Sequence, residues 1–396
     1  MSKLDELIAE LCPDGVEYVS IGNVVNYEQP SKYIVKSTDY SDEFSIPVLT
    51  AGQSFILGYT NEIDNIYKAS KENPVIIFDD FTGSFKWVDF PFKVKSSAIK
   101  MLTANSDIAT LRYIYHVMGN IGYSSDEHKR LWISIYSAIK IPLPPLPVQQ
   151  EIVRILDNFT ELTAELTAEL TARKKQYEYY RDKLLTFGDE VPMVKLSEIA
   201  TDMYRGAGIK RDEITDDGTP CVRYGEIYTT YNIWFDTCVS HTHKGTKTFE
   251  HGDILFAITG ESVEEIGKSC AYMGHETCFA GGDIVVMKHN QNPKYIAYAL
   301  STSNAQAQKS KGKVKSKVVH SSIPALKDIQ IPLPSLEEQE RIVAILDRFD
   351  ALCNDLTSGL PAEIEARQKQ YEYYRDKLLT FPARPKDVKE AKEVKT

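Results

Sequence analysis

The segment Ile141-Pro-Leu-Pro-Pro-Leu-Pro-Val-Gln-Gln-Glu-Ile-Val-Arg-Ile-Leu-Asp157 returns in the second half of the chain as Ile331-Pro-Leu-Pro-Ser-Leu-Glu-Glu-Gln-Glu-Arg-Ile-Val-Ala-Ile-Leu-Asp347. Each copy is followed by the string Gln-Tyr-Glu-Tyr-Tyr-Arg-Asp-Lys-Leu-Leu-Thr, which begins at Gln176 and again at Gln370. The spacing between the two motifs is four residues longer in the second copy, about one helical turn. The chain is therefore an internal repeat of a variable domain, a proline-rich hinge and a helix.

The hinges and the helices have separate physical signatures. The Ile-Pro-Leu-Pro run cannot lie inside a helix, because proline lacks the N–H and restricts the residue before it to extended conformations. From Gln149 onward, apolar residues recur every three or four positions, which predicts an amphipathic helix of about 37 residues and roughly 55 Å. Gly359 and Pro361 should interrupt the second helix.

Two such amphipathic helices are expected to pack antiparallel and to act as spacers between two globular domains. The first helix contains Thr-Ala-Glu-Leu twice between Thr163 and Leu170, and each copy adds about 6 Å. This repeat is either a low-complexity helix of good propensity or an adjustable ruler. The residues expected to pack the helices or to bind partner subunits are Leu162, Leu166, Leu170, Tyr177, Tyr180, Leu356, Leu360, Tyr371 and Tyr374.

These repeated strings and the tetrapeptide repeat closely resemble the specificity subunits of type I restriction–modification systems. The resemblance implies an α+β fold with two target recognition domains, each a curved β-sheet with small helices, joined by two long antiparallel helices in a pseudo-twofold repeat. Each domain would read one half of a bipartite, asymmetric site in double-stranded DNA. The family also implies that the segment before Val16 packs near the C-terminal helix.

The resemblance also implies the partners. The helices would dock two methyltransferase subunits, and restriction or motor subunits would complete the enzyme. This chain would bind no cofactor, since S-adenosylmethionine, ATP and magnesium would belong to the partners, and the methyl group would go to adenine N6. The domain boundaries expected are 1–140 and 188–330 for the recognition domains, 141–187 and 331–381 for the hinges and helices, and 382–396 for a flexible tail.

Composition is compatible with a cytoplasmic bacterial protein. No apolar run approaches the roughly 20 residues that span a bilayer, and the first eleven residues do not read as a signal peptide. The six cysteines show no metal-like spacing and are expected to be reduced thiols. The net charge of −10 does not favour phosphate binding, so the distribution of charge has to decide.

Basic residues gather in two acid-free stretches, Phe90–Ser106 and Ile284–Lys327, and Lys129 and Arg130 come just before the first hinge. From Ile284 to Lys327 the chain has eight lysines and no acid, and from Lys309 to Lys317 every second residue is lysine. An extended backbone would place that stripe on one side, as a track for phosphates, and the alternative is a solvated lysine-rich loop. The candidate phosphate contacts are Lys93, Lys95, Lys100, Lys129, Arg130, Lys309, Lys311, Lys313, Lys315 and Lys317.

Base-reading candidates are polar or aromatic residues in stretches expected to be loops. In the first domain these are Gln53, Tyr59, Thr60, Lys86 and Trp87. In the second domain they are Arg205, Lys210, Arg211, Arg223, Tyr224, Lys244 and Lys247.

Catalytic signatures are missing from the sequence. There is no phosphate-binding G-x-x-x-x-G-K-[ST] motif and no Asn-Pro-Pro-Tyr or Asp-Pro-Pro-Tyr string of an adenine methyltransferase. Asp79 and Asp80 with Lys86 suggest a nuclease only weakly, and His241 and His243 lack a second pair of metal ligands. We therefore expect a non-catalytic DNA-reading subunit with an unread gap of about six or seven base pairs, since two readers on one DNA face sit about 10 base pairs apart. The alternative is a free-standing DNA-binding regulator.

Overall fold

The computed structural model of the chain describes residues 2–52, 54–121, 130–263, 265–310, 313–315, 318–355 and 358–385, with the backbone alone at 313–315 and 318. The chain forms two compact units: unit 1 comprises Met1–Glu165 and Glu365–Thr396, and unit 2 comprises Leu166–Ile364. Both units mix helices with β-sheets, as predicted. None of the described helices is long and apolar enough to cross a membrane.

Unit 1 is built on two small sheets of orders β2-β8-β5-β6 and β4-β3-β7, with a separate two-stranded pairing of β1 and β9. Its elements are α1 (Lys3–Leu11), β1 (Glu17–Ser20), α2 (Ile21–Val24), β2 (Val25–Glu28), η1 (Ser31–Tyr33), β3 (Ile46–Leu49), β4 (Ile56–Thr60), β5 (Val75–Asp79), β6 (Phe85–Val88), β7 (Lys93–Val94), β8 (Ile99–Ala104), α3 (Leu111–Gly119), α4 (Leu131–Ser134), η2 (Tyr136–Ala138) and β9 (Lys140–Leu143).

Unit 2 repeats this plan with sheets of orders β11-β20-β16-β18-β13 and β14-β12-β19-β15, a third sheet β17-β22-β21, and the pairing of β10 with β23. Its elements are β10 (Met193–Lys195), α6 (Leu196–Ile199), β11 (Ala200–Arg205), η3 (Arg211–Glu213), β12 (Thr219–Val222), α7 (Tyr224–Thr229), β13 (Trp234–Phe235), β14 (Ser240–Thr242), β15 (Thr248–Phe249), β16 (Ile254–Ala257), β17 (Thr259–Gly260), β18 (Ser269–Tyr272), β19 (Cys278–Ala280), β20 (Ile284–His289), α8 (Pro293–Leu300), α9 (Ser303–Lys309), β21 (Lys313–Lys315), β22 (Val318–His320), α10 (Ile323–Lys327) and β23 (Gln330–Pro332).

Two helical segments belong to both units. The first, α5 (Leu146–Leu184), is continuous over 39 residues. It begins three residues before the predicted start, because Pro147 is tolerated in a first turn, where its missing N–H has no partner to lose. The second segment is broken into α11 (Leu336–Asn354) and α12 (Leu360–Leu378), as predicted. The break suits glycine, since a Cβ at Gly359 would lie 2.6 Å from the carbonyl oxygen of Ala351.

A buried glutamine fixes the start of each helix. Gln149 donates from Nε2 to the carbonyls of Pro144 (2.8 Å) and Ile108 (2.9 Å), and its Oε1 accepts the N–H of Thr110 (3.0 Å). This amide therefore joins the hinge, the helix and the loop before α3 in unit 1.

Gln339 has the same role in unit 2. It donates to the carbonyl of Pro334 (3.0 Å) and to Oε1 of Gln291 (3.0 Å), and accepts the N–H of Asn292 (3.1 Å). Both glutamine side chains are fully buried. A tyrosine completes each arrangement, since Tyr113 and Tyr295 donate to the carbonyls of Pro142 and Pro332, each at 2.9 Å. We call each set of hinge strand, buried glutamine and tyrosine a helix mount.

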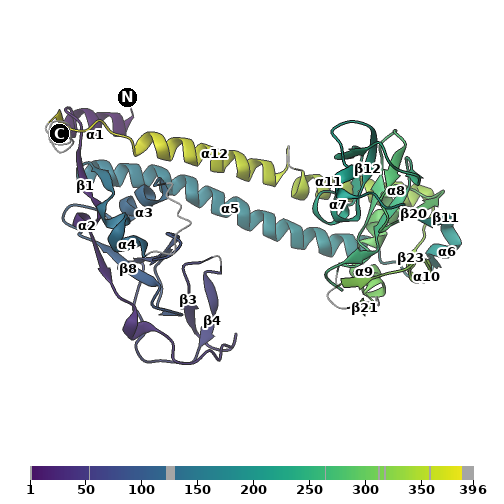
Figure 1. Cartoon of the computed structure of the whole chain (residues 1–396), viewed down its shortest axis with the longest axis horizontal. Coiled ribbons are helices and arrows are strands. Elements are labelled where there is room, and N and C mark those ends of the chain that lie inside the picture. The colour runs from purple at the N-terminus through teal and green to yellow at the C-terminus, as the bar shows by residue number, and fades with distance from the viewer. Residues whose placement is uncertain are drawn as a thin grey trace. The chain divides into compact units, whose positions relative to one another are not determined.

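The chain ends meet inside unit 1. The N–H of Val16 donates to the carbonyl of Pro382 (2.9 Å), and the N–H of Arg384 donates back to Val16 (3.1 Å). Leu4 on α1 and Phe381 share one hydrophobic core, and Figure 1 shows α1 beside the segment that follows α12. The predicted packing of the first segment near the C-terminal helix is confirmed. The predicted start of the flexible tail at Pro382 is wrong, because these backbone bonds hold residues 382–384 in the fold, whereas 386–396 lie outside the described residues.

Each unit also packs its own share of the helices. In unit 1 the end of α12 lies beside the beginning of α5 (Figure 1), where Tyr374 stacks on Phe159 with ring centroids 5.3 Å apart. In unit 2 Tyr180 stacks on Phe349 at 5.9 Å, and Tyr177 is buried in the core. The remaining predicted packing residues are buried at Leu360 and half-buried at Leu162, Leu166, Leu170 and Tyr371, while Leu356 lies outside the described residues.

Candidate nucleic-acid interface

The units share one feature that brings separate loops together, a pair of parallel strands. In unit 1, β3 runs parallel to β7, and the N–H of Lys95 donates to the carbonyl of Leu49 (3.0 Å). In unit 2, β12 runs parallel to β19, and the N–H of Gly281 donates to the carbonyl of Val222 (2.8 Å). Because parallel strands end at the same edge, the chain segments that follow them lie together. We call these segments the strand-end loops: 50–52 with 95–97 in unit 1, and 223–225 with 281–283 in unit 2.

The strand-end loops of unit 1 carry one exposed cation, Lys95. Its ammonium lies 3.4 Å from the hydroxyl of Tyr40 and 5.7 Å from the centre of that ring. Tyr40 in turn packs closely against Gly58 of β4, next to the half-buried Tyr59. An exposed lysine beside half-buried aromatic and hydroxyl groups suits contact with a nucleic-acid backbone.

The strand-end loops of unit 2 border a hollow of about 490 Å³. Its floor is glycine-rich because the loops approach each other closely: a Cβ at Gly206 would lie 2.1 Å from the carbonyl oxygen of Gly281. At Gly208 and Gly225, by contrast, an added Cβ would meet nothing within 4 Å. The hollow is lined by Gly208, Ile209, Arg223, Tyr224, Gly225, Glu226, Thr229, Gly281, Gly282 and Asp283.

Two arginines beside this hollow are held in different ways. Arg205 donates from Nε to the carbonyl of Gly282 and from Nη2 to Asp283, so it ties one loop to another. Within the described part of the chain, the guanidinium of Arg223 donates through Nε, to Oε1 of the buried Glu226 at 3.2 Å, and no other bond of this guanidinium is seen. The predicted reader Tyr224 is exposed beside it.

The other predicted basic residues of unit 2 lie on exposed segments. Lys244 pairs with Glu213 (3.3 Å), and Lys247 lies over the ring of Tyr204 at 5.8 Å. Hydrogen bonding, from the backbone of Lys210 first and then from Lys244, lowers the pKa of Glu213. Lys210 and Arg211 are exposed at η3.

Four candidates in the described chain are wrong because they are buried. Lys93 donates to Glu62 (2.7 Å) and to the carbonyl of Asp64 (2.9 Å), and Lys100 pairs with Asp80 (3.1 Å). Thr60 is buried as well. These residues stabilise unit 1 and cannot reach a phosphate.

The fourth is Lys309. It lies on helix α9 and donates to the carbonyl of Leu300 (2.7 Å) and to Oγ of Ser269 (3.3 Å). Burial lowers the pKa of this ammonium to about 7. The extended stripe predicted from Lys309 therefore does not begin at this residue.

The rest of the stripe is only partly described. Lys313 and Lys315 lie on β21, which is extended and pairs with β22, but their side chains lie outside the described part. Four further candidates lie entirely outside the described residues: Gln53, Lys129, Lys311 and Lys317.

Three further candidates of unit 1 are spread over its surface. Trp87 packs under Arg112, whose guanidinium carbon lies 4.7 Å from the ring centre, and against Tyr115. Lys86 is half-buried on the same strand, and Arg130 is exposed immediately before α4. The structure therefore does not bring these residues to the strand-end loops.

Two features of the described residues were not predicted from the sequence. One is Glu226, a buried carboxylate that the sequence analysis did not single out. The other is the exposure of one tyrosine in each Gln-Tyr-Glu-Tyr-Tyr string: Tyr179 is 61% exposed and Tyr373 is 62% exposed. Because the string is repeated, the two tyrosines can be compared, and both rings are exposed to the same extent.

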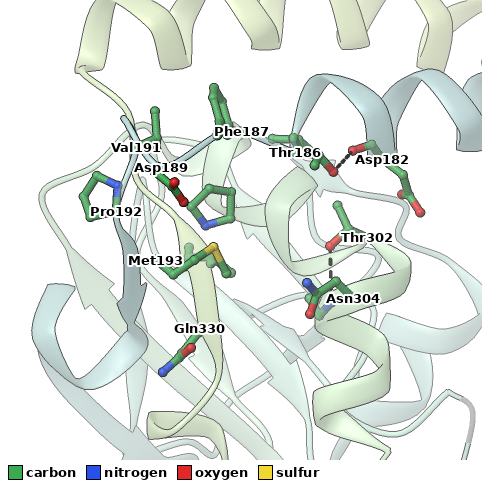
Figure 2. Close-up of a pocket in the computed structure, with 15 residues that line it drawn as sticks. Asp182, Thr186, Phe187, Asp189, Val191, Pro192, Met193, Thr302, Asn304 and Gln330 are labelled. Atoms are coloured by element: carbon green, nitrogen blue, oxygen red, sulfur yellow. Dashed lines mark hydrogen bonds between the residues drawn. The ribbon is translucent and has the colours of Figure 1, made fainter.

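A second hollow of about 490 Å³ lies elsewhere in unit 2 (Figure 2), between the end of α5, the start of α9 and β23. The charged side chains on its wall are Asp182 and Asp189. Asp182 accepts the N–H of Ser303 at 3.3 Å. The described residues that line this hollow include no lysine or arginine, whereas Arg223 lines the hollow at the strand-end loops, so the strand-end loops remain the better interface for a phosphate backbone.

Known proteins resemble the whole chain. The sequence model of the type I restriction modification DNA specificity domain matches residues 13–173 and 188–366. The EcoR124I/EcoR124II type I restriction enzyme specificity subunit of Escherichia coli is 43% identical over 408 aligned positions, covering 96% of this chain and 98% of that protein.

Solved structures show the same fold at low sequence identity. The type I restriction–modification S subunit of M. genitalium superposes with a TM-score of 0.55 at 14% identity, over 92% of this chain and 96% of its own. A chain from a structural study of assembly and conformational transition in a type I system superposes with a TM-score of 0.54 at 18% identity, over 93% of this chain and 98% of its own.

Proposed function

Since this chain belongs to the family of type I restriction–modification DNA specificity subunits, we propose that it reads a bipartite, asymmetric site in double-stranded DNA, one half with each unit. Specificity subunits are not catalysts, and the chemistry of the complex belongs to other chains. The free-standing regulator is not favoured, because the family match covers both halves of the chain.

The observation that carries the proposal is the pair of equivalent strand-end loops. The same backbone hydrogen bond joins the two strand ends in each unit, from Lys95 to Leu49 and from Gly281 to Val222. The side chains at these positions differ. Thr50 of unit 1 corresponds to Arg223 of unit 2, and Lys95 corresponds to Gly281. Two readers of the same construction with different side chains predict two half-sites of different sequence.

The exposed faces of the helices support the proposal of partner subunits. Tyr179 and Tyr373 occupy the same position of the repeated string and are equally exposed, which supports docking of two copies of one partner. We assign this partner as the methyltransferase subunit, with restriction subunits joining the complex. S-adenosylmethionine, ATP and magnesium are then bound by those chains. The recognition domains at 1–140 and 188–330, with the hinge–helix segments between and after them, remain part of this proposal.

The test is single-molecule methylome sequencing of DNA from cells that express this chain with a modification subunit. We expect methyladenine in both halves of an asymmetric motif, with an unread gap of about six or seven base pairs, since two modules that read one face of DNA bind about one helical turn apart. An assembled complex that methylates no new motif contradicts the proposal. A symmetric motif contradicts the assignment of one half-site to each unit.

A further inference from the structure

We propose that Arg223 is a specificity-determining residue that reads a guanine in the half-site of unit 2, and that Glu226 positions it. This inference rests on the proposed function and adds one base and one side-chain pair to it.

Glu226 is a buried carboxylate with three donors around it. Its Oε2 accepts the backbone N–H of Arg223 (3.0 Å), and its Oε1 accepts Nε of Arg223 (3.2 Å) and the hydroxyl of Ser240 (2.7 Å). A carboxylate fixed in this way has one orientation, because moving it would break bonds to two segments of the fold. It therefore fixes the arginine as well.

Holding an arginine by Nε has a geometric consequence. The guanidinium is planar, and its two Nη groups form an edge that does not include Nε. Arg223 is 34% exposed at the border of the hollow, so this edge is available to an external acceptor. Two parallel donors on a rigid plane match O6 and N7 of guanine in the major groove.

Arg205 shows the contrasting arrangement within the same unit. Its Nε donates to Gly282 and its Nη2 donates to Asp283, although its side chain is 58% exposed. A guanidinium bound along that side has a structural use, which is to hold the loop 281–283 against β11. Of the two arginines, Arg223 is the one arranged to read.

The surroundings leave room for a DNA edge. Gly208 and Gly225 flank Arg223 with open space where side chains would stand. Tyr224 is exposed next to it and offers an aromatic face and a hydroxyl. The paired negative charge of Glu226 also offsets the positive charge of Arg223, so this arginine contributes orientation more than general attraction to phosphate.

The experiment compares methylomes of assembled complexes that contain the full chain, either unchanged or with Arg223→Lys or Glu226→Gln. We expect the unchanged complex to require a guanine at one position of one half-site. Arg223→Lys should lower the preference for that guanine about 10- to 100-fold and leave the other half-site unchanged. Glu226→Gln should weaken the same preference at the same position, a change that a merely structural role would not confine to one base.

The matched control is Arg341→Lys. Arg341 also pairs with a glutamate three residues away, through Nε to Glu338 at 2.7 Å, but it lies on α11 away from the strand-end loops. Its substitution should leave the motif unchanged.

The outcomes separate the two proposals. No motif from the unchanged complex refutes the proposed function. A bipartite motif that stays the same in Arg223→Lys refutes only the reading role, as does a uniform loss at all positions of the half-site, which would indicate a phosphate contact.

A second measurement does not depend on the variants folding. The unchanged complex is bound to DNA duplexes in which 7-deazaguanine replaces one guanine at a time. This analogue lacks N7 and keeps O6, and the affinity for each duplex is measured. Loss of binding at one guanine in the affected half supports the inference, and no loss at any guanine overturns it.

Discussion

The two helix mounts predict that a glutamine-to-leucine substitution lowers the free energy of unfolding by different amounts in the two units. Replacing Gln149 by leucine keeps the volume but removes three hydrogen bonds, leaving the Thr110 N–H and the carbonyls of Ile108 and Pro144 without a partner. All three are backbone groups, and the bond to Pro144 is fully buried. At about 1–3 kcal/mol for each unsatisfied group, we expect unit 1 to lose about 4 kcal/mol of unfolding free energy.

Gln339→Leu should cost less. One of its three partners is the side chain of Gln291, which is half-buried and can turn toward solvent, and its bonds to Asn292 and Pro334 are only partly buried. We expect a loss of about 2 kcal/mol in unit 2.

Hydrogen exchange measured by mass spectrometry on the full chain reports each unit separately. Peptides covering α3 should exchange roughly 1000-fold faster in Gln149→Leu, since 1.4 kcal/mol corresponds to a factor of ten, and peptides covering α8 about 30-fold faster in Gln339→Leu. Gln150→Leu, at an exposed neighbouring position, is the control and should change exchange little. Equal losses in the two units, or losses below about 1 kcal/mol, would refute the reasoning from buried backbone groups.

Three further predictions concern a buried cation, an ion pair and the spacer. Lys309 has a folded pKa of about 7, below the ordinary value of 10.5, so the unfolded chain binds more protons between these values and the stability of unit 2 should rise with pH there, at up to about 1.4 kcal/mol per pH unit. Urea unfolding between pH 6 and 9 should show this rise in the unchanged chain and lose it in Lys309→Met, and parallel curves would contradict it. Burial raises the pKa of Asp157, but hydrogen bonds from His116 and Arg112, each at 2.8 Å, lower it more, so this carboxylate contributes stability above its unfolded pKa that is lost as pH falls. Asp157→Asn should therefore cost about 1 kcal/mol at pH 7 and less at pH 3, by thermal unfolding, because the carboxylate is partly exposed and screened; Glu161→Gln should have no effect. Adding one Thr-Ala-Glu-Leu copy to α5 lengthens it by about 6 Å, close to two base steps, and should widen the unread gap by one or two base pairs; an unchanged gap in the methylome would exclude the ruler.

The sequence was sufficient for the repeat and the helices, because their signals are local. Proline positions place the hinges, three- and four-residue spacing places the helices, and Gly359 with Pro361 places the break between α11 and α12. The buried role of Gln149 was not predicted, because a glutamine in a first helical turn is usually solvated and its partners at 108–110 belong to another element.

The interface was harder to predict, because it depends on contacts between distant residues. Lys95 and Arg223 were among the candidates, and the structure places both in strand-end loops, Lys95 after β7 in unit 1 and Arg223 after β12 in unit 2. Lys93 and Lys100 looked equally suitable in an acid-free stretch, but their partners Glu62 and Asp80 come from other parts of the chain. Net charge along the sequence cannot say which face of a strand is buried, and this explains the error.

The helix mounts also bear on how new specificities arise. The hinge carbonyls and buried glutamines of the helix mounts lie in the strings 141–157 and 331–347, which are nearly the same in both copies. A foreign domain that ends in this hinge and carries a tyrosine at the place of Tyr113 or Tyr295 has the contacts it needs. A recognition domain exchanged at the helix mount would therefore change one half-site of the DNA and leave the helices unchanged.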